Sequence, residues 1–167
     1  MRQRILLKTN FWLAILAIAA LVSACAGNIV DHSFAFDMRE DNQDAQVLDY
    51  RYGESKLPVF ANRERVAAGE VFGFEGVTGP MLRGDFLYVK WRNKESGKIY
   101  EDTVDLRKRL PADIAEHKIY FMIRGSQLYV YLIPPRENKR PKEKPPVGPS
   151  TYDYRDTVEI YPGSVNK

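Results

Sequence analysis

The stretch that decides the fold is Phe86-Leu-Tyr-Val-Lys-Trp-Arg92, then Asn93-Lys-Glu-Ser-Gly97, then Ile99-Tyr-Glu-Asp-Thr-Val-Asp-Leu106. The first and last segments are rich in aromatic and β-branched residues, which favour β-strands. The middle segment is a cluster of turn-forming residues that includes Gly97. The pattern therefore predicts a β-hairpin with its loop at Asn93–Gly97.

A second hairpin is predicted further along the chain. Apolar residues occupy every second position in 118–124 and again in 127–133. Gly125-Ser126 supplies a turn between the two segments. Val47–Tyr52 is predicted as the first firm strand, with Leu48, Tyr50 and Tyr52 on one face, and 156–161 as the last strand. Successive hairpins without a long helical pattern indicate a mainly β fold, an antiparallel β-sandwich of successive hairpins with little helix.

Two segments between the predicted strands are less regular. Asn62–Ala68 contains helix formers and is followed by Gly69, so one or two helical turns are expected there. Val71, Phe72 and Phe74 lie among several glycines, which predicts irregular strand and loop. These glycines lack the spacing of a phosphate-binding loop.

The N-terminus has the pattern of an export signal. The basic residues Arg2, Arg4 and Lys8 precede the uncharged stretch Phe11–Ser23, which is shorter than the roughly 20 apolar residues of a membrane-spanning helix. Small residues then precede the single cysteine, in Val22-Ser23-Ala24-Cys25. This ending resembles the lipobox of bacterial lipoproteins and implies cleavage before Cys25 and lipid attachment to its thiol. The alternative is an uncleaved membrane anchor.

These patterns predict three regions. Residues 1–24 are the lipoprotein signal peptide, 25–46 a mostly polar lipidated tether in which Phe34 and Phe36 allow a short strand, and 47–167 a single β-rich domain. The domain includes a proline- and lysine-rich loop at 134–151, which is expected to be solvated. Ala26 takes the place of the aspartate associated with retention in the inner membrane, so we expect a lipid-anchored protein of the outer membrane that faces the periplasm.

The charge distribution gives no sign of a nucleic-acid partner. The chain has 25 Lys and Arg against 22 Asp and Glu, and its formal net charge is +3. Arg2, Arg4 and Lys8 account for the whole excess, and no acidic residue precedes Cys25. The cleaved protein is therefore formally neutral, whereas a nucleic-acid-binding domain needs a basic face. With its one cysteine assigned to the lipid, the protein has no thiol for a disulfide or a zinc site.

No motif in the sequence predicts catalysis, a metal site or a cofactor. His32 and His117 are the only histidines, and neither a G-x-S-x-G nor an H-E-x-x-H pattern is present. Glu101 and Asp105 share one face of a predicted strand, an arrangement that glycoside hydrolysis could use. Cross-strand pairing with Lys90 and Arg92 explains these carboxylates more simply. We therefore expect a protein that is not an enzyme.

Alternation places a set of tyrosine and basic side chains opposite the predicted core positions. If the strands 86–92 and 127–133 share one exposed face, that face would be rich in the residues that dominate protein recognition and would bind a protein partner. Such tyrosines also suit sugar stacking, and the alternative is that both faces are covered and the tyrosines fill a second core layer. The candidate residues are Tyr88, Lys90, Arg92, Tyr129 and Tyr131.

Several of these segments resemble a group of Gram-negative lipoproteins. The residues that carry the resemblance are 84–92, 97–106, Leu110-Pro111, 119–121, 128–132 and Ile160-Tyr-Pro162. Members have a lipobox and a small β domain, and some are encoded beside phospholipase effectors of the type VI secretion system, where they are regarded as immunity proteins. The resemblance implies an envelope lipoprotein that binds and neutralises such an effector. The alternatives are a structural or assembly lipoprotein of the envelope and a hydrolase of cell-wall or lipid substrates.

The first prediction concerns processing at Cys25. Cells fed a labelled fatty acid should incorporate the label into the wild-type protein, while Cys25→Ala should incorporate none because the acylated thiol is missing. The measurement is the label in the purified protein. Equal labelling of the two proteins would rule out lipid attachment at this residue.

Overall fold

The computed structural model describes residues 29–41, 44–55, 57, 59–135, 148–152 and 155–163. Cys25 and the predicted signal peptide lie outside these ranges. Within them, no helix is both long and apolar enough to cross a membrane. The strands are β1 (Ile29–Asp37), β2 (Ala45–Tyr52), β3 (Phe74–Leu82), β4 (Phe86–Asn93), β5 (Ile99–Asp105), β6 (Lys118–Arg124), β7 (Gln127–Ile133) and β8 (Val158–Tyr161).

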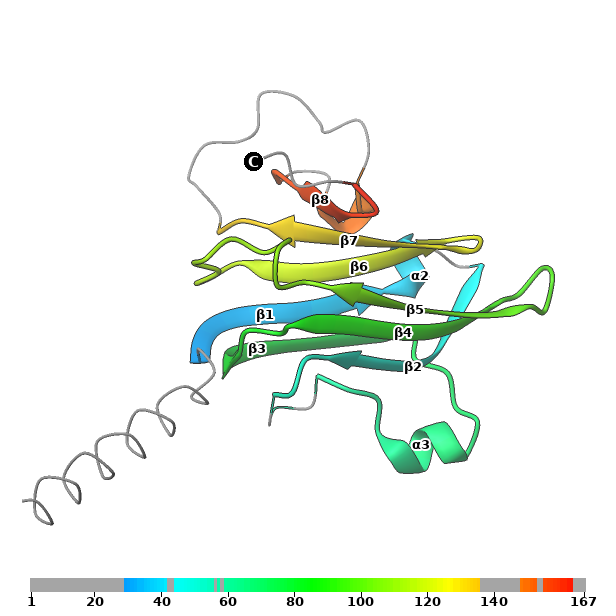
Figure 1. The fold of residues 1–167 in the computed structure, drawn as a ribbon. Coiled ribbons are helices and arrows are strands. Elements are labelled where there is room, and N and C mark those ends of the chain that lie inside the picture. The colour runs from blue at the N-terminus through cyan, green and yellow to red at the C-terminus, as the bar shows by residue number, and fades with distance from the viewer. Residues whose placement is uncertain are drawn as a thin grey trace, which may run out of the picture.

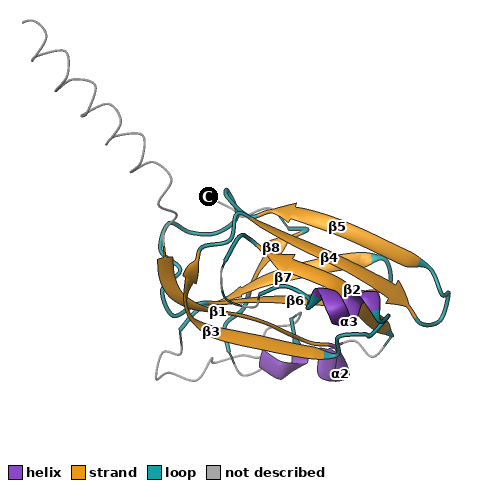
Figure 2. Ribbon diagram, turned by 90° about the horizontal axis from the view of Figure 1, so that it is seen from below, coloured by secondary structure: helices purple, strands orange, loops and turns teal. Residues whose placement is uncertain are grey.

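The strands form a two-layer β-sandwich. One sheet has five strands in the order β3-β1-β6-β7-β8, and the other has three in the order β2-β4-β5 (Figure 1). Seen from below in Figure 2, the two sheets lie as separate layers. The only helical segments described are short: α2 (Met38–Asp41), α3 (Arg63–Ala67) and the 3-10 turn η1 (Ser150–Tyr152). The predicted sandwich with little helix is therefore confirmed.

Both predicted hairpins are present. β4 pairs antiparallel with β5, and β6 pairs antiparallel with β7. Gly97 and Gly125 both have positive φ angles, the conformation that explains glycine at these two turns. One pairing departs from a purely antiparallel design, because β1 runs parallel to β6. The five-stranded sheet is consequently mixed.

The segment predicted as a tether contains β1, which is an inner strand of the five-stranded sheet. β1 lies between β3 and β6, and it pairs with β3 along its whole length. Phe34 and Phe36 are buried against the other sheet. The residues that alternate with them are Ala35, which is also buried, and the polar Asp31, Ser33 and Asp37. The high average polarity of the segment indicated a solvated tether, so the full length of the strand was not predicted. The prediction of a tether over 25–46 is therefore wrong from Ile29 onwards, and the domain includes β1 and α2.

Two smaller predictions also need correction. The glycine-rich stretch after Val71 forms the regular strand β3, because pairing with β1 offsets the low strand preference of its glycines. In β2 a bulge between Val47 and Asp49 shifts the alternation. The residues of β2 that face the core are therefore Val47, Tyr50 and Tyr52, and Leu48 is only half-buried.

Aromatic side chains from both sheets fill the centre of the sandwich. The ring of Phe34 stacks on Tyr52 at a centroid distance of 5.1 Å, and Phe36 stacks on Phe121 at 4.5 Å. Trp91 is buried at one end of this core, where its indole Nε1 donates to the carbonyl of Gly125 at 3.1 Å. That bond links β4 of one sheet to the β6–β7 turn of the other.

His32 joins the two sheets through a buried hydrogen-bond chain. Its Nδ1 lies 2.8 Å from the carbonyl of Val30, and its Nε2 lies 3.0 Å from the hydroxyl of Tyr52. The Tyr52 hydroxyl also accepts from the backbone N–H of Gly84 at 3.0 Å. Every partner is satisfied if the imidazole is neutral, with its proton on Nδ1 and with Tyr52 donating to Nε2. Burial accordingly lowers the pKa of His32.

Because the folded state disfavours protonated His32, the free energy of unfolding should fall as the pH drops through the ordinary histidine value of 6.5. Denaturant unfolding from about pH 7.5 to about pH 5 should show this loss in the wild type and a smaller loss in His32→Gln. If the variant does not fold, NMR titration of the wild-type imidazole gives the same answer. A His32 pKa at or above 6.5 would contradict the prediction.

Candidate functional site

The structure separates the five residues predicted to bind a partner. Tyr88, Lys90 and Arg92 lie on β4 in the three-stranded sheet, whereas Tyr129 and Tyr131 lie on β7 in the five-stranded sheet. In each strand the alternate residues are buried in the common core, so the two groups point to opposite outer faces of the sandwich. The expectation that the five share one face is therefore wrong. It fails because the β4–β5 hairpin belongs to the three-stranded sheet, whereas the β6–β7 hairpin belongs to the five-stranded sheet.

The outer face of the five-stranded sheet is largely covered. Tyr131 is 1% exposed, and burial raises its pKa to about 12. Ala35, Tyr120, Ile133 and Tyr152 form a second, smaller apolar cluster on this side. The alternative that the tyrosines fill a second core layer is thus correct for Tyr131. Tyr129 is half-buried, with the Arg124 guanidinium 5.6 Å from its ring centroid.

Asp41 holds the covering segment in place. Its carboxylate accepts from Ser150 N–H at 2.6 Å, from Ser150 Oγ at 2.7 Å and from Thr151 Oγ1 at 3.1 Å. The hydroxyl of Tyr120 donates to the same carboxylate, which together with burial raises the Tyr120 pKa. The end of the predicted 134–151 loop is therefore fixed to α2 and the sheet. Residues 136–147 of that loop lie outside the described ranges.

The outer face of the three-stranded sheet presents aromatic and charged side chains in rows. Residues opposite one another in an antiparallel pair share a face, so the register assigns each row. One row contains Arg51, Tyr88 and Thr103. Phe60 extends this row because it forms a β-bridge with Arg51, and it is 39% exposed. We call this surface the open face; it comprises Asp49, Arg51, Phe60, Phe86, Tyr88, Lys90, Arg92, Glu101, Thr103 and Asp105.

Carboxylates of the open face accept hydrogen bonds from groups on or beside it. The Tyr88 hydroxyl donates to Glu101 at 3.3 Å, and burial and that carboxylate raise the Tyr88 pKa. Asp49 accepts from Arg63 of α3 at 3.0 Å, and α3 lies beside β2 in Figure 2. The result is an aromatic centre surrounded by charges of both signs, an arrangement typical of protein-recognition surfaces.

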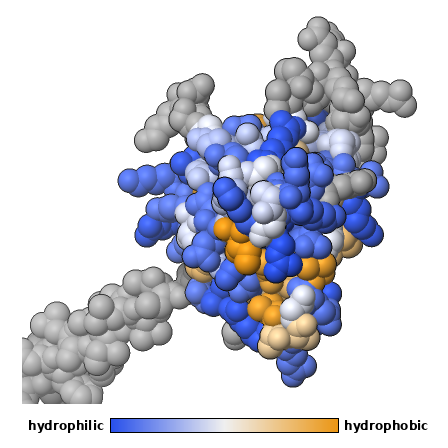
Figure 3. Space-filling view, turned by 90° about the vertical axis from the view of Figure 1, so that its right-hand side faces the viewer, coloured by the Kyte–Doolittle hydropathy of each residue, from blue (hydrophilic) through white to orange (hydrophobic). Residues whose placement is uncertain are grey.

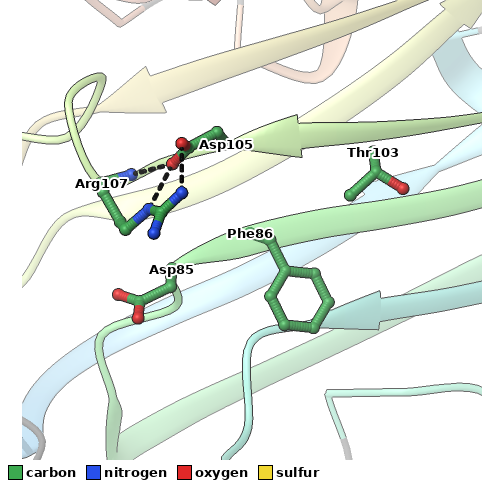
Figure 4. A pocket seen from close by; sticks show the side chains of 5 residues that line it. All are labelled: Asp85, Phe86, Thr103, Asp105 and Arg107. Carbon is green, nitrogen blue, oxygen red and sulfur yellow. Dashed lines mark hydrogen bonds and ion pairs between the residues drawn. The ribbon is translucent and has the colours of Figure 1, made fainter.

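An open hollow lies at one end of this face. It has a volume of about 440 Å³ and is lined by Asp85, Phe86, Thr103, Asp105 and Arg107 (Figure 4). Arg107 donates to Asp105 at 2.6 and 2.9 Å, and these bonds lower the pKa of Asp105 to about 2. Asp105 therefore stays ionised at neutral pH and can act as a hydrogen-bond acceptor toward a docked group. The Phe86 ring supplies the apolar part of the hollow.

The neighbouring carboxylates Glu101 and Asp102 of β5 have different partners. Glu101 lies opposite Lys90 in the β4–β5 register, as expected, although its hydrogen bond comes from Tyr88. Asp102 accepts from the Tyr161 hydroxyl at 2.7 Å, which connects β5 to β8. Across the described ranges, no group of three or more His, Cys, Asp and Glu residues is arranged to hold a metal ion.

A second exposed apolar patch lies at the end of the sandwich where β1 finishes. Phe74 is 51% exposed there, with the Arg39 guanidinium 4.7 Å from its ring centroid, and Val71 is exposed nearby. Figure 3 views this end and shows apolar side chains gathered in its lower half. This patch is separate from the open face, because Phe74 belongs to the five-stranded sheet.

Sequence reasoning missed Phe60 and Phe86 as members of the open face. Phe86 has the same alternation as Tyr88, so the strand pattern already contained the signal. Phe60 lies outside the regular strands and reaches the face only through its bridge to Arg51.

Comparison with protein-family models, with curated proteins and with solved structures finds no match to this chain.

The two tyrosine faces should respond differently to truncation. Tyr131→Ala should lower the free energy of unfolding by about 3–5 kcal/mol, the range for large buried aromatic side chains. Tyr88→Ala should cost about 1 kcal/mol or less, because it removes mainly cross-strand contacts on an accessible face. Denaturant unfolding of both variants is the measurement. Similar losses would show that the open face is part of the folded core.

Proposed function

We propose that this protein is a lipoprotein of the cell envelope, anchored to the outer membrane through Cys25, that binds a protein partner through the open face. The observation that carries the proposal is the accessible aromatic group of Phe60, Phe86 and Tyr88 within a rim of charges of both signs. Aromatic and arginine side chains contribute most of the binding energy at protein interfaces.

The open face also has the rigidity that a binding surface needs. Tyr88 and Phe86 project from the central strand of their sheet, which is paired on both sides by β2 and β5. Side chains held by ordered strands lose less entropy on binding than those of a loop. We therefore place binding at Tyr88, Lys90 and Arg92, and assign no part of it to Tyr129 and Tyr131 on the opposite side.

We further propose that the partner is a secreted phospholipase effector and that the protein confers immunity by capturing it. This step rests on the resemblance to lipoproteins encoded beside type VI secretion phospholipases. A lipid anchor would hold such a protein at the membrane that the effector attacks, which fits capture before hydrolysis. The hollow beside Phe86 is large enough to receive an aromatic or basic side chain of the partner.

The test is binding of the phospholipase effector encoded beside the gene, measured by calorimetry. Tyr88→Ala should weaken the affinity about thirty-fold, equivalent to about 2 kcal/mol, as expected for a central interface tyrosine. Tyr129→Ala is the matched control on the other face and should bind like the wild type.

Two outcomes would overturn the proposal in different ways. If no effector gene lies beside this gene, or the effector does not bind, the immunity function fails. If it binds and Tyr129→Ala weakens the affinity while Tyr88→Ala does not, the binding site is on the opposite face.

A further inference from the structure

The start of β1 fixes how far the folded domain can stand from its lipid. β1 begins at Ile29, four residues after the predicted lipid-attachment residue Cys25. A chain of four residues spans at most about 14 Å even when fully extended. The predicted tether of 25–46 would have allowed several times that distance.

The same strand defines two ends of the sandwich. The near end, where β1 begins, also contains the β3–β4 turn at 83–85 and the β5–β6 connection at 106–117, because Ile29 pairs with Leu82 and Phe86 pairs with Asp105 (Figure 1). The far end contains α2 and the turns at 94–98 and 125–126. β1 has nine residues, so the two ends are separated by about 26 Å.

We propose that the near end faces the surface of the lipid bilayer, so that the strands run away from the membrane and the open face stands sideways to it. This inference rests on the proposed lipid attachment at Cys25. Ile29, at the tip of the near end, is 69% exposed and becomes the part of the described domain closest to the headgroups.

In this orientation the covalent lipid, attached four residues before β1, holds the near end at the membrane. Acidic side chains outnumber basic ones among the exposed residues that the structure describes there, so these residues give no net attraction to an anionic surface. The exposed acidic residues are Asp31, Glu54, Asp85, Asp105, Asp113 and Glu116, and the exposed basic residues are Arg107 and Lys108.

The test uses single engineered thiols, which label uniquely because the chain has one cysteine and the lipid occupies it. Lys108→Cys places a fluorophore at the near end, and Lys94→Cys places one at the far end with the same change of charge. Each lipidated full-length protein is reconstituted into phosphatidylethanolamine and phosphatidylglycerol vesicles that carry a nitroxide quencher at the headgroup. The near-end probe should lose most of its fluorescence and the far-end probe little, and high salt should leave the difference unchanged.

A spacer variant supplies the control. A flexible insert of about 20 Gly and Ser residues between Gly27 and Asn28 should release the near-end probe and remove most of the difference. If Lys94→Cys is quenched as strongly as Lys108→Cys while lipid labelling is normal, the proposed orientation is wrong. If the wild type incorporates no lipid, the proposed anchor fails, and the orientation fails with it.

Discussion

The packing of β1 against β2 is the contact on which the rest of the structure depends. Phe34 stacks on Tyr52, and Phe36 contacts Tyr50 at a centroid distance of 5.1 Å, so two aromatic residues from each sheet form the centre of the core. β1 also lies between β3 and β6, and its removal would leave β3 without a strand to pair with in that sheet. The buried His32 adds a polar link between the same two strands.

Features that depend on residues close together in the sequence could be predicted, whereas features that depend on contacts between distant segments could not. The β4–β5 and β6–β7 hairpins were predictable because alternation and a glycine turn are local signals. For β1, Phe34 and Phe36 indicated only a short strand in a tether, because the extent and burial of β1 depend on pairing with residues far along the chain, such as Ser33 with Lys118. For the site, alternation correctly placed Tyr88 outside the core. It could not show that β4 and β7 belong to different sheets, because contacts between hairpins are decided by tertiary packing.

The two outer faces of the sandwich differ because of the path that the chain takes after β7. Residues 148–152 return across the five-stranded sheet, where Asp41 caps the turn at Ser150 and Tyr152 packs on Tyr120. This return helps to bury Tyr120, a side chain that alternation alone would place in solvent. Tyr131 on the same face is also buried, and its hydroxyl donates to Glu159 of β8 at 3.4 Å. The three-stranded sheet has α3 only beside its β2 edge, where Arg63 reaches Asp49. The aromatic residues of β4 therefore stay accessible on that side.

Because the chain enters the fold at the end where β1 begins, one end of the open face lies closer to the proposed membrane surface than the other. β4 begins near the same end as β1, so Phe86 and the hollow lie in the row closest to the proposed membrane surface. Arg92 lies six residues further along, about 20 Å away. A partner on this face would sit beside the domain with one edge toward the bilayer. A phospholipase held there would have its membrane-facing side within reach of the lipid, so neutralisation would require the open face to cover the catalytic entrance and not only to hold the enzyme.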